Sequence, residues 1–358
     1  MARKIVLITS PSLDFKSNVS GISSVIRNIT GFFGGHIRFV HLKVGKLDKS
    51  SRVVGLISAA YDVLNALIRI SIYRKSAILH LNLALNRKAI WRDFPLVFFA
   101  RLLGIPILLH LHGGEFLDKK ADGILGKITE YYFFSAKKII ALSSIEVQIV
   151  QRLYLVPKDR ITYMYNSVRV EKILSRNYSP IGHLSILFAG RLIEEKGVSV
   201  ILKLIEANLH GVEIRIAGQG TMLDEVQRVC AKSENAKYLG VLKESELRDA
   251  MRASDVLLLP SRSGEGMPMV IVEGMSEGIV PICTAMASIP EIIFDGRTGL
   301  FIAADDLSGV IDKIKLLRDD LDRRREMSFS AREFAVNNFE RSHALKELSA
   351  AYSELGDF

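Results

Sequence analysis

Residues 190–197 (GRLIEEKG) bring two cations and two glycines together in one short segment. The segment follows an apolar run and precedes a helical pattern, which is typical of a βα turn. Glycine allows the backbone to approach a ligand, and a helix N-terminus favours anions. Arg191 and Lys196 could then close around a diphosphate from two sides. A βα turn that merely carries two surface cations fits the same sequence, so this segment alone leaves both interpretations open.

Residues 261–273 (SRSGEGMPMVIVE) form a second segment of this kind, again after an apolar run. Pro268 suits the first turn of a helix, which places Glu265 in the loop and Glu273 on the helix. Free N–H groups at a helix start can meet phosphate oxygens. A carboxylate can accept both hydroxyls of a sugar diol. The alternative is a loop charge at Glu265 and an exposed helix residue at Glu273, but the tight Gly-Glu-Gly-x-Pro context favours binding.

These segments need a scaffold, and the apolar pattern predicts one. Short apolar runs alternate with helical periodicity along the 358 residues, which indicates parallel α/β architecture. In the first half we expect strands at 5–8, 37–42, 78–81, 107–111 and 139–142, and helices at 23–32, 59–73, 92–103 and 126–135. In the second half we expect strands at 185–189, 213–217, 237–239, 255–260, 280–284 and 299–302, and helices at 198–207, 222–233, 244–253, 269–277 and 306–318.

Two consecutive βα series predict two doubly wound domains rather than one barrel. The boundary should fall near 166–180, where Ser, Asn and Pro gather. A last helix, at about 342–355, lies beyond a complete second domain, so we expect it to pack elsewhere, back on the first half. In open α/β sheets ligands bind at the carboxyl ends of strands, which is where both charged segments should lie.

The two charged segments together resemble the retaining glycosyltransferases of family 4, which have the GT-B fold. The Gly-Arg-Leu-x-x-x-Lys-Gly pattern at 190–197 and the Glu-x7-Glu element ending at Glu273 carry most of the resemblance. Residues 217–220 (AGQG), 290–293 (PEII) and 295–299 (DGRTG) match as well. The resemblance extends over nearly the whole chain; it is strongest at 184–299 and weaker in the first 170 residues.

The resemblance implies two Rossmann-like doubly wound domains that face each other across a cleft. Residues 1–168 would form the N-terminal, acceptor-binding domain, together with a C-terminal helix at about 340–358 that crosses back to it. Residues 169–339 would form the domain that binds the nucleotide sugar.

The resemblance also implies a role for individual residues of the second domain. Arg191 and Lys196 would hold the donor diphosphate, Glu273 would bind the nucleotide ribose, and Glu265 would contact the transferred sugar. Backbone N–H groups would assist at Gly266, Met267 and Met269.

In the first domain, the resemblance places His112 at the donor sugar and Gly21 in a loop that closes over phosphate and acceptor. The chain departs from the family pattern in places. Many members have Gly-Gly where this chain has Ser20-Gly21, and again before the Pro-Glu at 290–291; Ser167 stands where a Gly is usual. None of these departures removes a charged group.

No metal ion or other cofactor is expected. Breaking a sugar–phosphate bond leaves extra negative charge on the diphosphate, which Arg191, Lys196 and helix N–H dipoles could neutralise. The one Asp-x-Asp, Asp320 to Asp322, lies in a charged helical stretch and is interpreted as a solvated face. The family implies retention of anomeric configuration by front-side attack, with the donor phosphate helping to deprotonate the acceptor.

Charge separates the two halves of the chain. Residues 1–170 hold 25 Lys and Arg against 10 Asp and Glu, whereas residues 171–358 hold 23 against 29. The basic half should favour an anionic partner such as a phosphorylated lipid or a membrane surface. Residues 68–75 (IRISIYRK) and 87–94 (RKAIWRDF) mix aromatic and basic residues as membrane-interface segments do. Core helices with basic outer faces are the alternative. No zinc-finger, helix-turn-helix or RNP-type pattern supports nucleic acid.

Location can be inferred from three observations. The best transmembrane candidate, 94–111, is interrupted by Arg101, and the apolar run at 5–8 is too short for a signal peptide. Cys230 and Cys283 have no metal-ligand spacing, which fits a reduced compartment. We therefore expect a cytoplasmic protein, peripheral at the inner face of the cell membrane.

His80 and His110, in apolar strands, are expected to be core residues.

The preferred function is transfer of a sugar from a UDP- or GDP-linked donor to a hydroxyl of a glycan or lipid-linked precursor in surface polysaccharide or glycolipid synthesis. Two alternatives stay open. One is a non-catalytic nucleotide-sugar-binding subunit of a transferase complex, which the altered glycine loops would allow. The other is a GT-B sugar-nucleotide epimerase, against which the intact charged motifs argue.

Overall fold

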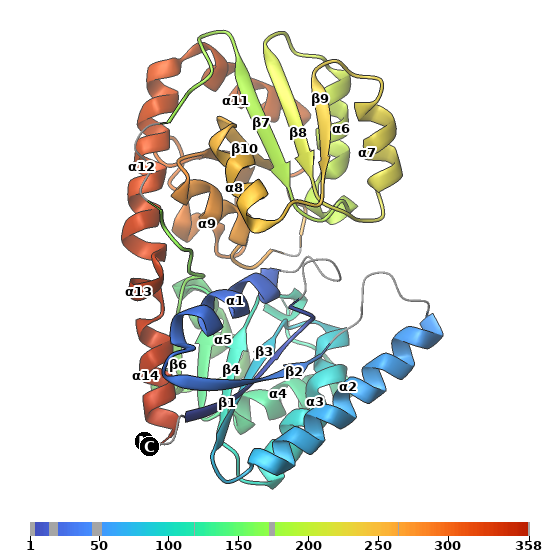
Figure 1. Cartoon of the computed structure of the whole chain (residues 1–358), viewed down its shortest axis with the longest axis vertical. Helices are drawn as coiled ribbons and strands as arrows, with labels where there is room; N and C mark the ends of the chain where they lie inside the picture. Colours follow the sequence, from blue (N-terminus) through green and yellow to red (C-terminus); the bar gives the residue numbers. More distant parts are fainter. Residues whose placement is uncertain are drawn as a thin grey trace. The chain divides into compact units, whose positions relative to one another are not determined.

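A computed structural model describes residues 4–13, 21–44, 52–117, 119–171, 176–263 and 265–356, with the side chains of 52–57 left aside. The chain divides into two compact units (Figure 1). The first contains residues 1–167 and 341–358, and the second contains residues 168–340. Each is described below by itself. None of the helices in the described ranges has both the length and the apolar content that crossing a membrane requires.

The first unit is built on a six-stranded parallel sheet with strand order β2-β1-β3-β4-β5-β6. Its central strands are buried on both faces, which explains why they are nearly continuous apolar runs. The strands are β1 (Lys4–Ser10), β2 (Ile37–Lys43), β3 (Ala77–Leu83), β4 (Ile107–Leu111), β5 (Lys138–Ala141) and β6 (Ile161–Tyr163). The sequence predicted the first five and missed β6.

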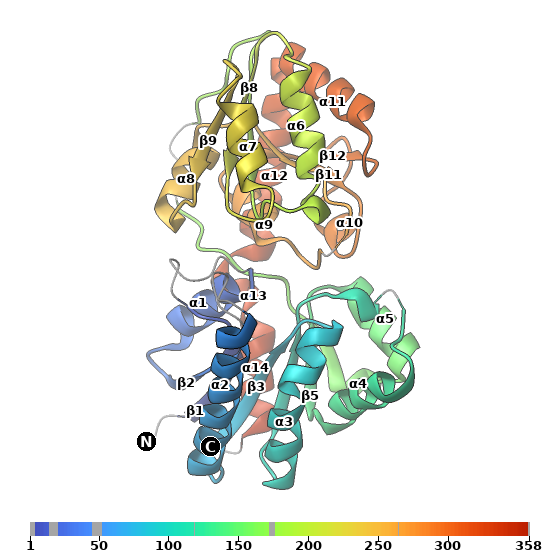
Figure 2. The ribbon, with the colours of Figure 1, turned by 90° about the vertical axis from the view of Figure 1, so that its right-hand side faces the viewer.

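Helices cover both faces of this sheet. On one face α2, α3 and α4 pack side by side, as Figure 2 shows. The other face carries α1, whose Phe33 ring lies 5.8 Å from that of Tyr352 near the C-terminus. The helices are α1 (Gly21–Phe33), α2 (Arg52–Tyr73), α3 (Arg87–Leu102), α4 (Gly123–Ser135) and α5 (Ser144–Tyr154), with 3-10 turns η1 (Glu115–Leu117) and η2 (Lys158–Arg160). Helix α5 was not predicted.

The C-terminal segment, α13 (Arg341–Ala344) and α14 (Lys346–Leu355), returns to the first unit as expected. Tyr352 on α14 is 2% exposed, and its hydroxyl lies 2.7 Å from His80 Nδ1 in β3. Lys138 Nζ lies 2.8 Å from a Glu354 carboxylate oxygen. These contacts join residues more than 200 positions apart and fix the helix on the sheet.

The second unit repeats the architecture with strand order β12-β11-β10-β7-β8-β9, all parallel. Its strands are β7 (Leu184–Ala189), β8 (Val212–Ala217), β9 (Ala236–Gly240), β10 (Val256–Leu259), β11 (Val280–Thr284) and β12 (Leu300–Ile302). Its helices are α6 (Val198–Glu206), α7 (Leu223–Cys230), α8 (Glu244–Arg252), α9 (Met269–Ser276), α10 (Ile289–Ile292), α11 (Leu307–Asp319) and α12 (Leu321–Phe339), with the 3-10 turn η3 (Glu194–Lys196). Two parallel doubly wound sheets confirm the predicted fold class.

Helix α12 is longer than the sequence suggested and packs against α9. Asp320 caps it by accepting a hydrogen bond from the Arg323 amide at 2.9 Å, and Asp322 is exposed. The Asp-x-Asp is therefore a helix start with a solvated face, as expected.

Chain order creates a switch point in the second sheet. From β7 the chain winds through β8 and β9 on one side, then returns to β10 on the other side of β7. In open α/β sheets ligands bind at such a switch point, outside the carboxyl ends of the strands, where the βα loops after β7 and β10 lie. Both charged segments of the sequence occupy these two loops. In the first sheet the corresponding switch point lies between β1 and β3.

Candidate functional site

The loop after β7 presents the first predicted pair of cations. Arg191 is exposed, and its side chain has no hydrogen-bond or ion-pair partner among the residues that the structure describes. Lys196 ends η3 and is half-buried. Gly197 follows with a φ of 71°, and a Cβ there would lie 2.0 Å from the Pro260 carbonyl oxygen. Glycine at 197 thus allows this loop to lie directly against the loop after β10.

The loop after β10 carries Glu265, which meets Lys196. Lys196 Nζ lies 2.5 Å from Glu265 Oε1, and the two side chains are 13% and 5% exposed. The Ser261 hydroxyl donates to the same carboxylate oxygen at 2.5 Å. Burying a carboxylate is costly unless it is paired and hydrogen-bonded, and Lys196 and Ser261 supply both interactions.

Arg262 fastens the two loops together. Its amide donates to the Glu195 carbonyl at 2.9 Å, and its guanidinium pairs with Glu194 and Asp305. The ion pairs and hydrogen bonds to these carboxylates raise the pKa of Arg262. The Lys196–Glu265 pair is therefore held between loops that are joined on either side of it.

Helix α9 begins directly after the Glu265 loop. Pro268 precedes its first residue, Met269, whose amide belongs to the turn in which helix N–H groups have no acceptor within the helix. Met267 and Met269 are buried, at 4% and 7% exposure. A helix N-terminus with free amides favours a phosphate. Glu273 lies one turn further along.

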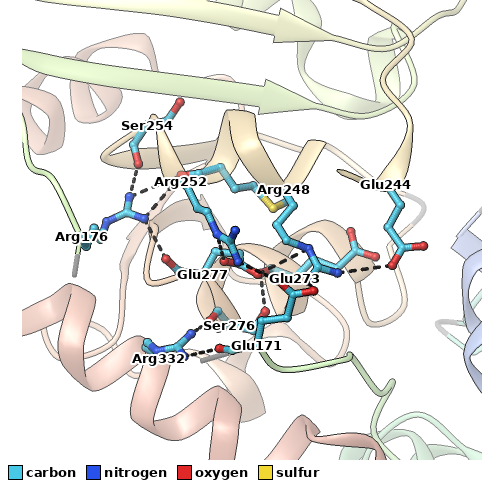
Figure 3. Close-up of polar contacts among 11 residues, drawn as sticks. Glu171, Arg176, Glu244, Arg248, Arg252, Ser254, Glu273, Ser276, Glu277 and Arg332 are labelled. Carbon is cyan, nitrogen blue, oxygen red and sulfur yellow. Dashed lines mark hydrogen bonds and ion pairs between the residues drawn. The ribbon is translucent and has the colours of Figure 1, made fainter. Parts of the chain in front are cut away.

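An ionic network anchors the end of α9. Glu277, 3% exposed, lies 2.7 Å from Arg252 Nε and 3.7 Å from Arg248 Nε, both on α8. Glu171 pairs with the same two arginines, which lower its pKa. Arg332 of α12 donates to the Glu171 and Ser276 carbonyls. Figure 3 shows Glu273 among these groups, so the helix that carries it is held from both neighbouring helices.

The AGQG motif at 217–220 has a packing explanation. Gly218 has a φ of 140°, and a Cβ there would lie 1.8 Å from the Gly190 carbonyl oxygen. The Leu192 amide donates to the Gln219 carbonyl at 2.8 Å. These glycines let the loop after β8 support the loop that presents Arg191.

The first unit contributes His112, directly after β4. Its Nε2 lies 2.8 Å from Asn82 Oδ1, and its ring centroid lies 4.3 Å from that of His110. Burial lowers the pKa of His112 to about 3, so the ring is neutral at physiological pH. His112 as a residue is half-buried.

His80 and His110 are core residues, as expected, and both are 0% exposed. His80 Nε2 lies 3.2 Å from His110 Nδ1, and burial lowers both pKa values, that of His80 to about 3. Gly21 is the first residue of α1 and has open space around its Cα. Residues 14–20, in the same loop, and Gly264, beside Glu265, lie outside the described residues.

The structure therefore gathers Arg191, Lys196, Glu265 and the start of α9 at the switch point of the second unit, whereas His112 and Gly21 belong to the first. Within the described ranges, no three His, Cys, Asp or Glu side chains gather in a way that could hold a metal ion.

Residues 172–334 match the family model described as Glycosyl transferases group 1. The second unit of the chain belongs to this family. A group 1 glycosyltransferase of family 4 is what the two charged loops indicated, and the enzyme activity is glycosyl transfer from a nucleotide sugar. An uncharacterised glycosyltransferase of Methanocaldococcus jannaschii, MJ1178, is 28% identical over 263 residues, which cover 71% of this chain and 70% of that protein.

Solved structures of other glycosyltransferases share the GT-B fold. Anabaena Alr3699/HepE, crystallised with UDP-glucose, is 14% identical with a TM-score of 0.76, covering 98% of this chain and 100% of that one. The lipopolysaccharide outer core galactosyltransferase WaaB is 18% identical with a TM-score of 0.66, covering 98% and 99%. At these identities the likeness shows the fold of this glycosyltransferase alone.

Two partner residues were missed by the sequence analysis. Ser261 binds Glu265, and its position at the start of the charged loop was the available signal. Asn82 binds His112 from the neighbouring strand, and the signal was one amide within the apolar run of β3. The Ser261 contact spans four residues of one loop, whereas the packing of two separate strands brings Asn82 to His112.

Proposed function

We propose that this enzyme transfers a sugar, with retention of configuration, from a UDP- or GDP-linked donor to a hydroxyl of a lipid-linked glycan precursor. The product would serve surface polysaccharide or glycolipid synthesis. The observation that carries the proposal is the Lys196–Glu265 pair beside the N-terminus of α9. It combines a cation and free amides for a diphosphate with a carboxylate for a sugar.

The donor site would use these groups as follows. Arg191, exposed and without a partner in the described part of the chain, and Lys196 hold the diphosphate. The amides of Gly266, Met267 and Met269 donate to its oxygens. A bound diphosphate offers Lys196 a second anion, while a sugar hydroxyl offers Glu265 a hydrogen-bond donor. Charge that develops on the leaving diphosphate is stabilised by groups already in place, so the proposed step needs no metal ion.

The remaining contacts complete the donor. Glu273 accepts hydrogen bonds from the ribose hydroxyls, and the first unit binds the acceptor. His112 contacts the transferred sugar, and Gly21 belongs to the loop that closes over phosphate and acceptor. The donor phosphate helps to remove the proton of the attacking hydroxyl on the same face of the sugar, which retains the configuration. The name of WaaB, a lipopolysaccharide galactosyltransferase, favours a surface glycan as product.

A membrane-bound acceptor is supported by the surface of α2 and α3, which pack against each other. Both helices leave large apolar side chains exposed. These side chains are Tyr61, Leu64, Ile68, Ile72, Trp91, Phe98 and Leu102. The exposed cations on or beside the same helices are Arg69, Arg74, Lys75, Arg87, Lys88 and Arg101. Apolar and aromatic side chains interspersed with cations suit the interface of an anionic bilayer. We place the enzyme at the inner face of the cell membrane through this α2–α3 surface.

Release of nucleoside diphosphate from a panel of UDP-, GDP- and ADP-sugars, with EDTA present, tests the function. Without acceptor, slow hydrolysis is expected from one donor, insensitive to EDTA and lost in Glu265→Ala. A lipid-linked glycan acceptor should accelerate release. Tight nucleotide binding with no release under either condition would instead indicate a non-catalytic nucleotide-sugar-binding subunit.

A further inference from the structure

Asn82 lies between β1 and the loop after β4 and is held on three sides. It is 2% exposed. Its backbone amide donates to Thr9 Oγ1 at 2.9 Å, and its side-chain Nδ2 donates to the Thr9 carbonyl oxygen at 2.9 Å. Its Oδ1 lies 2.8 Å from His112 Nε2. The His112 backbone is fixed beside it, because the His112 amide donates to the Leu83 carbonyl at 2.9 Å.

These contacts determine which way the amide of Asn82 points. A backbone carbonyl oxygen can only accept, so the group that faces Thr9 must be the NH₂ of the side chain. The carbonyl oxygen of the same amide therefore faces His112. Because this oxygen also can only accept, His112 must carry a hydrogen on Nε2.

The other nitrogen of His112 then follows from the charge of the ring. Burial lowers the pKa of His112 to about 3, and the nearest ring, His110, has a pKa lowered well below its usual value. A neutral imidazole has one N–H, so Nδ1 holds a lone pair and only accepts. Nδ1 has no hydrogen-bond partner in the described part of the unit, and His112 as a residue is half-buried rather than fully enclosed. It is thus open to a donor from outside.

We propose that Asn82 is a positioning residue that fixes the Nε2–H form of His112 and so presents Nδ1 as a hydrogen-bond acceptor for a hydroxyl of the transferred sugar. The contact between Nδ1 and a sugar hydroxyl rests on the function proposed for His112 above. The fixing of the Nε2–H form by Asn82 does not depend on that function. The enzyme should then discriminate against donors whose hydroxyl at the contacted position is replaced by fluorine, because fluorine cannot donate to Nδ1. A site that has a buried polar group to satisfy rejects such an analogue.

Nitrogen-15 NMR of the full-length protein tests the imidazole directly. Long-range ¹⁵N–¹H correlation distinguishes the Nε2–H form, the Nδ1–H form and the imidazolium, and His112→Gln assigns the signal. At neutral pH the wild type should show Nε2–H at His112. Asn82→Leu, which removes the acceptor, should shift the signal toward the Nδ1–H form. Asn28→Leu, which removes another buried amide of this unit, should leave it unchanged.

Kinetics test the sugar contact. With donors fluorinated in turn at positions 3, 4 and 6, the wild type should lose about tenfold or more in kcat/KM at one position, which corresponds to about 1.4 kcal/mol. Asn82→Leu should reduce that ratio, and Asn28→Leu, which removes another buried amide of this unit, should preserve it.

Each outcome bears on one part of the proposal. The positioning role of Asn82 is overturned if NMR finds the Nδ1–H form or the imidazolium at His112 in the wild type. It is also overturned if His112 keeps the Nε2–H form in Asn82→Leu. The expected NMR result with equal use of fluorinated and hydroxylated donors overturns the sugar contact but not the role of Asn82. If no donor is turned over at all, the proposed function fails, while the NMR result still decides the positioning role.

Discussion

Lys196 Nζ lies 2.5 Å from Glu265 Oε1 and joins the turn after β7 to the loop after β10. These strands are neighbours in the sheet although about 70 residues separate the two side chains in sequence. The lysine that we propose for the diphosphate and the carboxylate that we propose for the sugar thus pair with each other in this structure. The pair keeps two charged groups ordered at the switch point without leaving either one unpaired.

Replacing Lys196 should harm both binding and transfer. Lys196→Ala removes the proposed diphosphate contact and leaves Glu265 with Ser261 as its remaining partner among the described residues. We expect kcat/KM to fall by about 10²–10³, as for loss of one group that stabilises transition-state charge. Nucleoside diphosphate affinity, measured by calorimetry, should fall as well. Lys203→Ala, an exposed lysine on α6, is the matched control, and equal activity of the two variants would contradict the role of Lys196.

Replacing Glu265 should separate binding from turnover. Glu265→Gln keeps the side-chain shape and an oxygen for the Ser261 hydroxyl but removes the charge that pairs with Lys196. Lys196 is then free for phosphate, so nucleoside diphosphate should bind as tightly as before or more tightly. Turnover should fall by about 10² or more, because an interaction with the reacting sugar is lost. A variant with normal turnover and weaker nucleotide binding would show that Glu265 serves the nucleotide instead.

Glu273 should distinguish ribose from its deoxy form. A hydrogen bond to a charged acceptor contributes about 1.5–3 kcal/mol, so wild-type enzyme should bind a nucleoside diphosphate at least about tenfold tighter than its 2′,3′-dideoxy analogue. Glu273→Ala should bind both equally. Glu206→Ala, at the exposed end of α6, should keep the preference. Calorimetry of each of these three proteins with each of the two nucleotides checks this. A preference that survives Glu273→Ala would remove the residue from the ribose site.

Acidification should destabilise the first unit through its buried histidines. Burial lowers the pKa values of His80 and His112 to about 3 and that of His110 well below the usual 6.5. Below pH 6.5 the unfolded chain takes up protons that the folded chain refuses until about pH 3. Stability should therefore fall as pH falls through this window, by up to about 1.4 kcal/mol per pH unit for each histidine.

Thermal unfolding between pH 7 and pH 5 measures this dependence, since carboxylates such as Glu171, whose pKa is lowered, remain ionised there. His80→Gln removes one titrating ring and keeps an amide that can hydrogen-bond Tyr352. It should flatten the pH dependence of the midpoint temperature relative to wild type. A slope identical to that of wild type would show that His80 is not protonated on unfolding.

The α2–α3 surface should bind anionic vesicles. In flotation at low salt, wild-type protein should rise with vesicles that contain phosphatidylglycerol and remain below with phosphatidylcholine alone. Ile72→Glu and Trp91→Glu add a negative charge to exposed apolar positions of this surface and should abolish flotation. Val241→Glu, at an exposed apolar position of the second unit, should not. Equal flotation with both lipids, or none with either, would exclude this surface as an anionic-membrane site.

Strand β6, which the sequence analysis missed, and helix α12, which it predicted too short, each have an identifiable physical cause. Strand β6 has three residues and lies at the sheet edge, so its apolar signal is short. Helix α12 is strongly charged and lacks a clear apolar face, and only the cap at Asp320 marks its start. In both cases packing against neighbours stabilises an element that its own pattern specifies weakly.

By itself, the sequence determined the two α/β units and the loops that carry Arg191, Lys196, Glu265 and Glu273, because buried parallel strands and helix starts have local patterns that place such loops at the carboxyl edge. Only the tertiary structure decided which side chains contact each other. Strand order brought Lys196 to Glu265, the neighbouring strands brought Asn82 to His112, and the returning C-terminal helix brought Tyr352 to His80. These pairs depend on sheet order and on long-range packing, which no spacing along the chain encodes.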